Sequence, residues 1–118
     1  NGYRLPMEAE WEYAAKGGED YKYAGSNDLN EVGWYMDNSG DKTHGVGQKK
    51  SNDYGLYDMS GNVFEWCFDT YDSSARVNRG GGWRYDAYRC VVSCRCRYYP
   101  SFRRYGIGGV RLFRSSNS

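Results

Sequence analysis

Residues 55–66 read GLYDMSGNVFEW, and this stretch marks the point where a loop-rich region passes into regular structure. The sequence Asn-Asp-Tyr-Gly at 52–55 predicts a turn just before it, because Asn, Asp and Gly favour the backbone conformations that turns require. Over residues 62–67 the apolar and aromatic side chains alternate, which predicts a short strand. Further short strands are expected at 76–83, 88–95 and 110–113.

One helix is expected in residues 1–18, on the N-terminal side of this region. Trp11, Ala14 and Ala15 have the i, i+3, i+4 spacing of one buried helical face, and Gly17 with the next glycine ends the helix. Three glutamates occupy its N-terminal half, where the helix dipole favours negative charge. These glutamates are Glu8, Glu10 and Glu12. We interpret them as facing solvent; the alternative is a catalytic role.

The region between helix and strands, residues 19–56, is rich in Gly, Asn, Asp and Ser. An irregular region of this length is unusual in a compact domain, so we expect aromatic side chains such as Trp34 and Tyr35, or a bound ion, to hold it. His44 is the only histidine in the chain. Without a partner histidine it is interpreted as a surface-loop residue rather than a metal ligand or catalytic base.

Composition excludes several classes of protein. The 118 residues correspond to one domain or part of one. Aromatic residues make up 18% of the chain although its mean hydropathy is -0.93, and such an aromatic content argues against intrinsic disorder. No apolar run approaches the roughly 18 residues of a membrane-spanning helix, so this chain is not expected to insert into a membrane. No basic-then-apolar secretion signal occurs within these residues.

Positive charge concentrates in residues 84–106, which hold six Arg and one Asp, a net +5, against a net -4 elsewhere. A solvated surface is one interpretation. A binding patch is the other, because Arg and Tyr are enriched at interaction hot spots. Nucleic acid is a third possibility, but the absence of Lys from this segment and the acidic remainder of the chain argue against a groove that follows a phosphate backbone.

Residues 84–106 also contain no Lys, Glu, Gln, Met or Trp. At ordinary usage, roughly four or five such residues are expected in a window of this length. These five types are the ones that no codon ending in a pyrimidine encodes. The bias therefore points to how the segment is written in DNA, and it predicts a binding surface that is changed on purpose.

Five motifs follow one another through the chain. They are GYRLP at 2–6, EAEWEYAA at 8–15, GLYDMSGNVFEW at 55–66, RGGGW at 79–83 and GVRL at 109–112. In this order they resemble the formylglycine-generating enzyme (sulfatase-modifying factor) family. The resemblance implies an α+β, irregular C-type-lectin-like fold, loop-rich with short antiparallel strands and few helices. The family's N-terminal strands and first helix have no counterpart, so a single domain over 1–118 without that part is expected.

Within this family, the chain most resembles the variable proteins of diversity-generating retroelements, in which a reverse transcriptase copies a template repeat with errors at adenines. Fixed residues of their variable repeat match Gly81-Gly82-Trp83, Ala87, Cys90, Val92-Ser93, Arg95, Pro100-Ser101, Arg103 and Ile107-Gly108. The sequence departs from the pattern at Gly82, where Ser is usual, and at Gly108-Gly109, where one Gly is usual.

This resemblance implies a variable ligand-binding region at about 79–112, in which fixed residues pack inward and mutable ones point outward. All intervening positions carry residues that pyrimidine-ending codons encode, Val91 and Gly106 among them. Thirteen of them are the expected ligand contacts: Arg84, Tyr85, Asp86, Tyr88, Arg89, Cys94, Cys96, Arg97, Tyr98, Tyr99, Phe102, Arg104 and Tyr105.

The family's enzymes bind copper through two cysteines five positions apart, which fall on Tyr85 and Cys90 of this chain. One thiolate does not supply the paired soft ligands that select Cu(I), so no copper is expected. Cys94 and Cys96 do not restore the spacing. Cys67 and Cys90 are interpreted as buried small apolar residues or as a structural pair.

A structural calcium ion is the one cofactor that the resemblance implies. Its expected ligands are the side chains of Asp58 and Glu65 and the carbonyls of Gly61 and Val63. Two carboxylates with carbonyls in a tight turn suit a hard cation. In the alternative, Asp58 caps the turn and Glu65 pairs with an arginine.

Together these observations predict a non-catalytic domain that binds a protein ligand on another cell or host, and not nucleic acid. The resemblance further implies display outside the cell, at a cell surface or a phage tail. Three alternatives stay open: an active or degenerate formylglycine-generating oxidase, a lectin-like adhesin with a fixed surface, and a nucleic-acid binder.

Overall fold

The computed structural model describes residues 2–72, 75–98 and 108–114. The regular elements in these ranges are few and short, as an α+β class of this kind requires. In chain order they are β1 (Tyr3–Arg4), α1 (Glu8–Lys16), α2 (Leu29–Val32), β2 (Phe64–Thr70), β3 (Arg76–Arg79), the 3-10 helix η1 (Ala87–Cys90), β4 (Arg95–Tyr98), β5 (Gly108–Gly109) and β6 (Phe113–Arg114).

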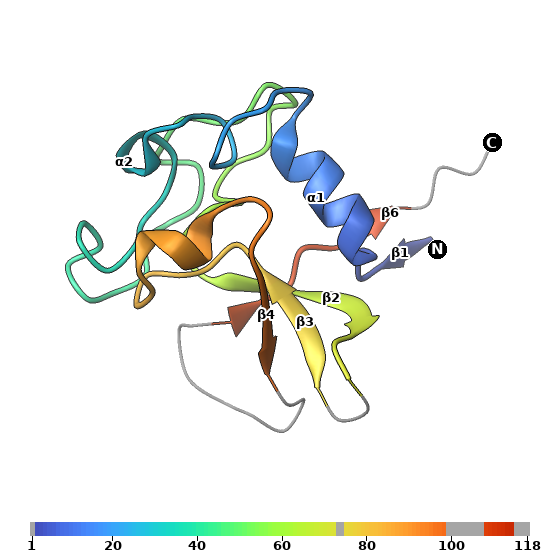
Figure 1. Cartoon of the computed structure of the whole chain (residues 1–118). Helices are drawn as coiled ribbons and strands as arrows, with labels where there is room; N and C mark the ends of the chain where they lie inside the picture. Colours follow the sequence, from blue (N-terminus) through green and yellow to red (C-terminus); the bar gives the residue numbers. More distant parts are fainter. Residues whose placement is uncertain (1, 73–74, 99–107, 115–118) are drawn as a thin grey trace.

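Four strands form the main sheet, in the order β4-β3-β2-β5 (Figure 1). The pairs β4–β3 and β3–β2 are antiparallel, whereas β2 and β5 run parallel. The terminal strands β1 and β6 form a separate antiparallel pair beside the start of α1. This arrangement confirms the predicted α+β fold with short, mainly antiparallel strands.

The core lies between α1 and the sheet. Trp11 and Ala15 on α1 are fully buried, as are Cys67 on β2 and Val77 on β3. These side chains belong to one cluster with Met59, which lies in the loop before β2. The predicted helical face is therefore confirmed, and the aromatic residues compensate for the low mean hydropathy, because one large ring buries roughly 150–250 Å².

The end of α1 agrees with the sequence prediction, but the expected solvent exposure of its glutamates is wrong. Gly17 ends the helix with a φ of 61°, a conformation that glycine adopts without steric cost. Glu10 pairs with Arg4, whereas Glu8 and Glu12 both pair with the buried Arg79. A guanidinium group inside the protein requires carboxylate partners, and this requirement draws the two glutamates toward the core.

The strand predicted at 62–67 is present as β2, but the one at 88–95 is wrong. The Asp86 carboxylate accepts a hydrogen bond from the Arg89 N–H at 3.2 Å and closes the 3-10 turn η1. The strand predicted at 110–113 is also wrong, since residues 110–112 lie between β5 and β6 and only Phe113 of that range belongs to a strand. Arg111 between them extends to Glu65 and to the Tyr57 carbonyl, which holds the chain away from a strand path.

The loop-rich region is tied to the rest of the domain by side chains, as expected. Asn52 donates to the carbonyl of Ala14 at 2.6 Å. Trp34 stacks on His44 with ring centroids 3.7 Å apart, and the His44 ring bonds to the Ser39 carbonyl oxygen. His44 is thus half-buried rather than a plain surface residue. Within the described ranges no helix has the length and apolar character needed to cross a membrane.

Candidate ligand-binding face

A glycine turn after β3 sets the direction of the segment that follows. Gly80 and Gly81 have φ angles of 95° and 70°, where a residue with a Cβ is strained. A Cβ on Gly81 would also lie 2.5 Å from the Cys90 sulfur. Glycine therefore allows the chain to turn back and pack against η1, with Cys90 fully buried beneath it.

Arg79, the last residue of β3, joins this turn to α1. Its side chain is 1% exposed, and its two terminal nitrogens pair with Glu8 at 3.2 Å and Glu12 at 2.6 Å. It also donates to the Val92 carbonyl and lies over the Trp11 ring at 5.1 Å. The sequence analysis missed this residue, although two helical glutamates at i and i+4 facing an arginine before the glycines were a usable signal.

The segment after the glycine turn, which holds the predicted mutable positions, is fixed to the domain through its main chain. The Ser60 hydroxyl donates to the Cys90 carbonyl at 2.8 Å, and the Val92 N–H donates to the Lys22 carbonyl at 2.9 Å. The Tyr85 carbonyl accepts from the Met36 N–H at 3.0 Å. These bonds involve none of the segment's side chains, so they persist when those side chains change.

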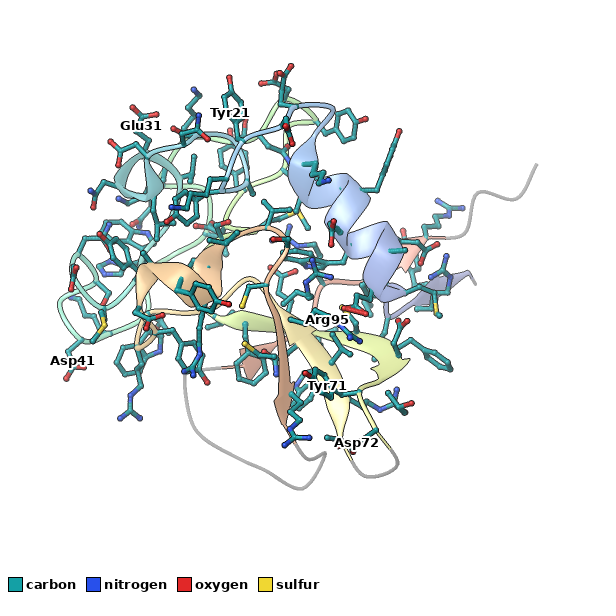
Figure 2. The ribbon with its side chains drawn as sticks, in the orientation of Figure 1. Tyr21, Glu31, Asp41, Tyr71, Asp72 and Arg95 are labelled. Atoms are coloured by element: carbon teal, nitrogen blue, oxygen red, sulfur yellow. The ribbon has the colours of Figure 1, made fainter. Side chains whose placement is uncertain are left out.

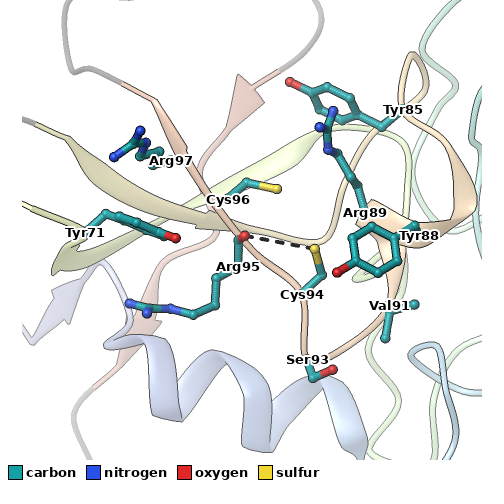
Figure 3. A pocket seen from close by; sticks show the side chains of 10 residues that line it. All are labelled: Tyr71, Tyr85, Tyr88, Arg89, Val91, Ser93, Cys94, Arg95, Cys96 and Arg97. Atoms are coloured by element: carbon teal, nitrogen blue, oxygen red, sulfur yellow. Dashed lines mark hydrogen bonds between the residues drawn. The ribbon is translucent and has the colours of Figure 1, made fainter.

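A cavity of about 670 Å³ opens between η1 and β4 (Figure 3). Seven of its ten lining residues are positions that the sequence analysis identified as mutable. The other three are Ser93 and Arg95 of the fixed set and Tyr71, which precedes β3. The mutable residues are Tyr85, Tyr88, Arg89, Val91, Cys94, Cys96 and Arg97.

The remaining predicted contacts fall in three places. Arg84 and Asp86 are exposed but do not line the cavity. Tyr98 is the last residue of β4. Four predicted contacts, and the fixed Ile107, lie outside the described residues: Tyr99, Phe102, Arg104 and Tyr105.

The fixed residues behave differently from the mutable ones. Cys90 and Val92 are 0% and 2% exposed, whereas Tyr88 between β3 and β4 is 75% exposed. Trp83 is half-buried and Arg95 is exposed, so the inward packing of fixed residues holds at some positions and not at all. Where it holds, a change at a neighbouring mutable position leaves the core untouched.

Arginine and tyrosine side chains pair across the cavity wall. Tyr71 lies between Arg95 and Arg97, with its ring 4.9 and 5.4 Å from the two guanidinium carbons. Figure 2 shows Arg95, Tyr71 and Asp72 following one another down this side of the sheet. Arg97 also pairs with Asp72 at 2.9 Å. Cation–π contacts of this kind hold both partners in defined positions.

The four cysteines are all free thiols. Burial raises the pKa of Cys67 and of Cys90 to about 12, so both behave as small apolar residues and no structural pair forms between them. Cys94 and Cys96 line the cavity instead. Burial, and then the neighbouring Cys94, raises the pKa of Cys96 to about 11, which leaves it protonated at neutral pH.

Three of the four residues predicted to bind calcium, Asp58, Val63 and Glu65, line a smaller cavity of about 230 Å³, and Gly61 does not line it. Asp58 is buried, and one carboxylate oxygen accepts from the Gly47 N–H at 2.9 Å, while the other has no hydrogen-bond partner. Among the described residues, no three His, Cys, Asp or Glu side chains gather as a metal-binding group.

The Glu65 carboxylate already accepts hydrogen bonds from Arg111 and Trp11. It accepts from Arg111 at 2.8 and 3.0 Å and from the Trp11 indole at 2.9 Å, so the arginine pairing considered as an alternative is present. The open oxygen of Asp58 fits a cation, whereas Glu65 is already neutralised.

The fold and the glycine turn at residues 80–81 define a domain of the formylglycine-generating-enzyme type. A cavity rich in Tyr and Arg follows that turn. The chain belongs to the family described as sulfatase-modifying factor enzyme 1-like domain, which matches residues 1–116.

Comparison with solved structures and with other proteins supports the more specific resemblance. Treponema denticola variable protein 1 has a TM-score of 0.89 and 45% identity, and the match covers 93% of this chain and 46% of that one. Chaperone protein LppX of Paenibacillus barcinonensis is 40% identical over 144 aligned positions, covering 98% of this chain and 50% of that protein.

Both inactive and active relatives are similar to the chain. Inactive C-alpha-formylglycine-generating enzyme 2 of Bos taurus is 39% identical and covers 70% of this chain and 33% of its own length. Formylglycine-generating enzyme of Thermomonospora curvata is 36% identical, with 72% and 33% covered. The chain thus spans half or less of these relatives. Similarity to a variable protein and to an inactive relative supports a non-catalytic domain of this fold.

Proposed function

We propose that this chain is a non-catalytic ligand-binding domain whose surface within residues 84–106 is diversified by a retroelement. The carrying observation is the composition of the larger cavity, because seven of its ten lining residues are predicted mutable positions. The buried Cys90 and Val92 lie within the same segment. A surface built in this way changes its binding chemistry without a change to its core.

The ligand that fits this surface is a protein on another cell or host. Tyrosine supplies rigid contact area at low conformational cost, as in antibody loops, and arginine adds bidentate and stacking contacts. Such a ligand requires display outside the cell, at a cell surface or a phage tail, and this location is part of the proposal.

The test is to sequence the coding DNA and its flanks across many clones of the source population. We expect pyrimidine-ending codons at the mutable positions, variation among clones there, and a nearby template repeat rich in adenine. Invariant codons without a template would show that the surface is fixed, as in an ordinary adhesin.

The competing function is copper-dependent oxidation. Of the two positions that hold the enzyme's copper-binding cysteines, the first is the half-buried Tyr85 in this chain. The second is Cys90, which is buried and whose pKa burial raises to about 12. We therefore expect neither tight copper binding nor oxygen uptake in the presence of a cysteine-containing peptide. Stoichiometric copper binding that is lost in Cys90→Ser would favour the oxidase instead.

We also propose that Ca²⁺ binds near Asp58, supported by its buried, unpartnered carboxylate oxygen beside a cavity. The carbonyls of Gly61 and Val63 are the other expected ligands, and Glu65 contributes only as far as Arg111 allows. Ca²⁺ that binds the folded state raises its melting temperature. We expect this rise in the wild type and its loss in Asp58→Asn, which tolerates the positive φ at that position; an equal rise in both proteins would contradict the site.

A further inference from the structure

We infer that the larger cavity receives an acidic segment of the ligand protein, with Arg89 as the residue that holds its carboxylate. The inference rests on the proposed ligand-binding function and specifies its chemistry. It depends on the charge of the cavity wall, on the pairing state of its arginines and on the aromatic rings beside them.

The wall of the cavity is positive. Among the described residues, three arginines and three tyrosines line it, and no Asp, Glu or Lys does. At about 670 Å³ the cavity falls in the range of roughly 300–1,000 Å³ typical of ligand pockets. Its volume therefore suits one or two side chains of a bound peptide.

The three arginines differ in their partners. Arg95 pairs with Glu8 and Arg97 pairs with Asp72, so the charge of each is already balanced. Arg89 has no carboxylate partner for its side chain among the described residues; it lies over the Tyr85 ring at 5.5 Å. Figure 3 shows its guanidinium group between Tyr85 and Tyr88, on the cavity side.

A guanidinium group stacked on a ring keeps its planar set of N–H donors available at the edge, and these donors match a carboxylate with two parallel hydrogen bonds. The adjacent tyrosine rings provide contact area for the rest of a peptide. A nucleic acid is less favoured, because Glu8 and Asp72 lie where further phosphates would have to approach Arg95 and Arg97.

The test is a selection of random phage-displayed peptides on the purified chain, followed by affinity measurement on the enriched peptides as synthetic molecules. We expect enrichment of Asp and Glu, and affinity that falls about tenfold or more when the acidic residue is replaced by its amide. Arg89→Gln should cause a similar loss, since a hydrogen bond to a charged group is worth about 1.5–3 kcal/mol and 1.4 kcal/mol is tenfold.

Arg114→Gln is the matched control. It removes the same charge, and Arg114 is an exposed residue of β6 outside the predicted ligand-binding region, so its effect should be within about twofold, as for distant charges screened by solvent. Circular dichroism and melting curves establish that both variants fold, and an oligonucleotide of the same net charge tests the nucleic-acid alternative.

Enriched peptides that are neutral or basic would overturn the inference, as would equal losses in the two arginine variants, tighter binding of the oligonucleotide, or a selection without any enriched peptide. Clone sequencing reports independently on the proposed function. If the clones vary but the acidic-peptide test fails, only the inference about the ligand is wrong. If the clones are invariant, the proposed diversification is wrong even if acidic peptides bind.

Discussion

Two arginine-rich regions of the same domain contrast sharply. Arg79 at the end of β3 is 1% exposed and has two carboxylate partners and a main-chain carbonyl around it. Arg97 on the neighbouring β4 is 55% exposed and pairs with Asp72 at the surface. The same residue type thus holds the framework together in β3 and lines an exposed cavity in the neighbouring strand β4.

The contrast shows how the domain separates stability from recognition. Interactions that fix the fold lie in α1, β2, β3 and the glycine turn, where side chains are buried. The side chains that line the cavity between η1 and β4 are half-buried or exposed. The predictions below test this separation, starting with the change expected to cost most.

Arg79→Met should be the most damaging substitution. It removes the buried cation from between Glu8 and Glu12 and leaves them only their surface partners Arg95 and Lys16, and breaking such a buried pair costs on the order of 3–5 kcal/mol. Urea unfolding gives the free energy of unfolding. Arg97→Met is the matched control with an expected cost of about 0–1 kcal/mol; equal losses in the two variants would end the distinction drawn here.

Gly81→Ala should come second, at about 2–5 kcal/mol. A left-handed backbone costs a non-glycine residue about 1–2 kcal/mol, and the contact with the Cys90 sulfur adds about 1–3 kcal/mol of overpacking. Thermal melting measures the sum. Gly55→Ala has a similar φ of 80° with open space around it, so it isolates the backbone cost, and a Gly81 variant no worse than this control would remove the packing argument.

Glu10→Gln should have a small effect that depends on pH. The Arg4 guanidinium, with the Met7 N–H, lowers the pKa of Glu10 to about 2 from 4.5. A lowered pKa stabilises the fold above the ordinary value, and this contribution is lost as pH falls from about 4.5 through 2. Melting curves of the two proteins should therefore differ slightly at pH 7 and converge near pH 2; a constant difference would assign the effect to something other than the charge.

Tyr88→Ser should have the smallest effect on folding. With 75% of its surface exposed, the expected change in the free energy of unfolding is within about 0.5 kcal/mol, whereas the set of peptides that bind should change. A loss of several kcal/mol at this position would mean that the cavity wall supports the fold after all, and the separation of roles would fail.

Much of the framework follows from the sequence, because local signals and packing agree there. The apolar spacing of Trp11, Ala14 and Ala15 predicts the buried face of α1, and the residues before Cys67 predict β2. The strand predicted at residues 88–95 is wrong because their β-forming side chains are outweighed by two local features. Asp86 caps a 3-10 turn, and the close packing of Gly81 on the buried Cys90 favours that turn over an extended chain.

The sequence predicts which residues line the larger cavity but not how they are arranged. The residue types of 84–106 identify Tyr85, Tyr88 and Arg89 as candidate surface residues, yet they do not show that Tyr71, from another part of the chain, lines the same cavity. Arg79 is invisible for a similar reason, since its partners lie 67 and 71 positions earlier. Long-range ion pairs leave only a weak pattern in a single sequence.

The anchoring of the segment through its main chain has a consequence for evolution. Ser60 and Arg79 donate to the carbonyls of Cys90 and Val92, and the Val92 N–H donates to the Lys22 carbonyl. In this segment these bonds use main-chain atoms, which are present whichever side chains the codons encode. Under the proposed function, changes at the exposed codons would then alter specificity while these anchoring bonds stay in place. A population of such genes would be a repertoire whose members differ in what they bind more than in whether they fold.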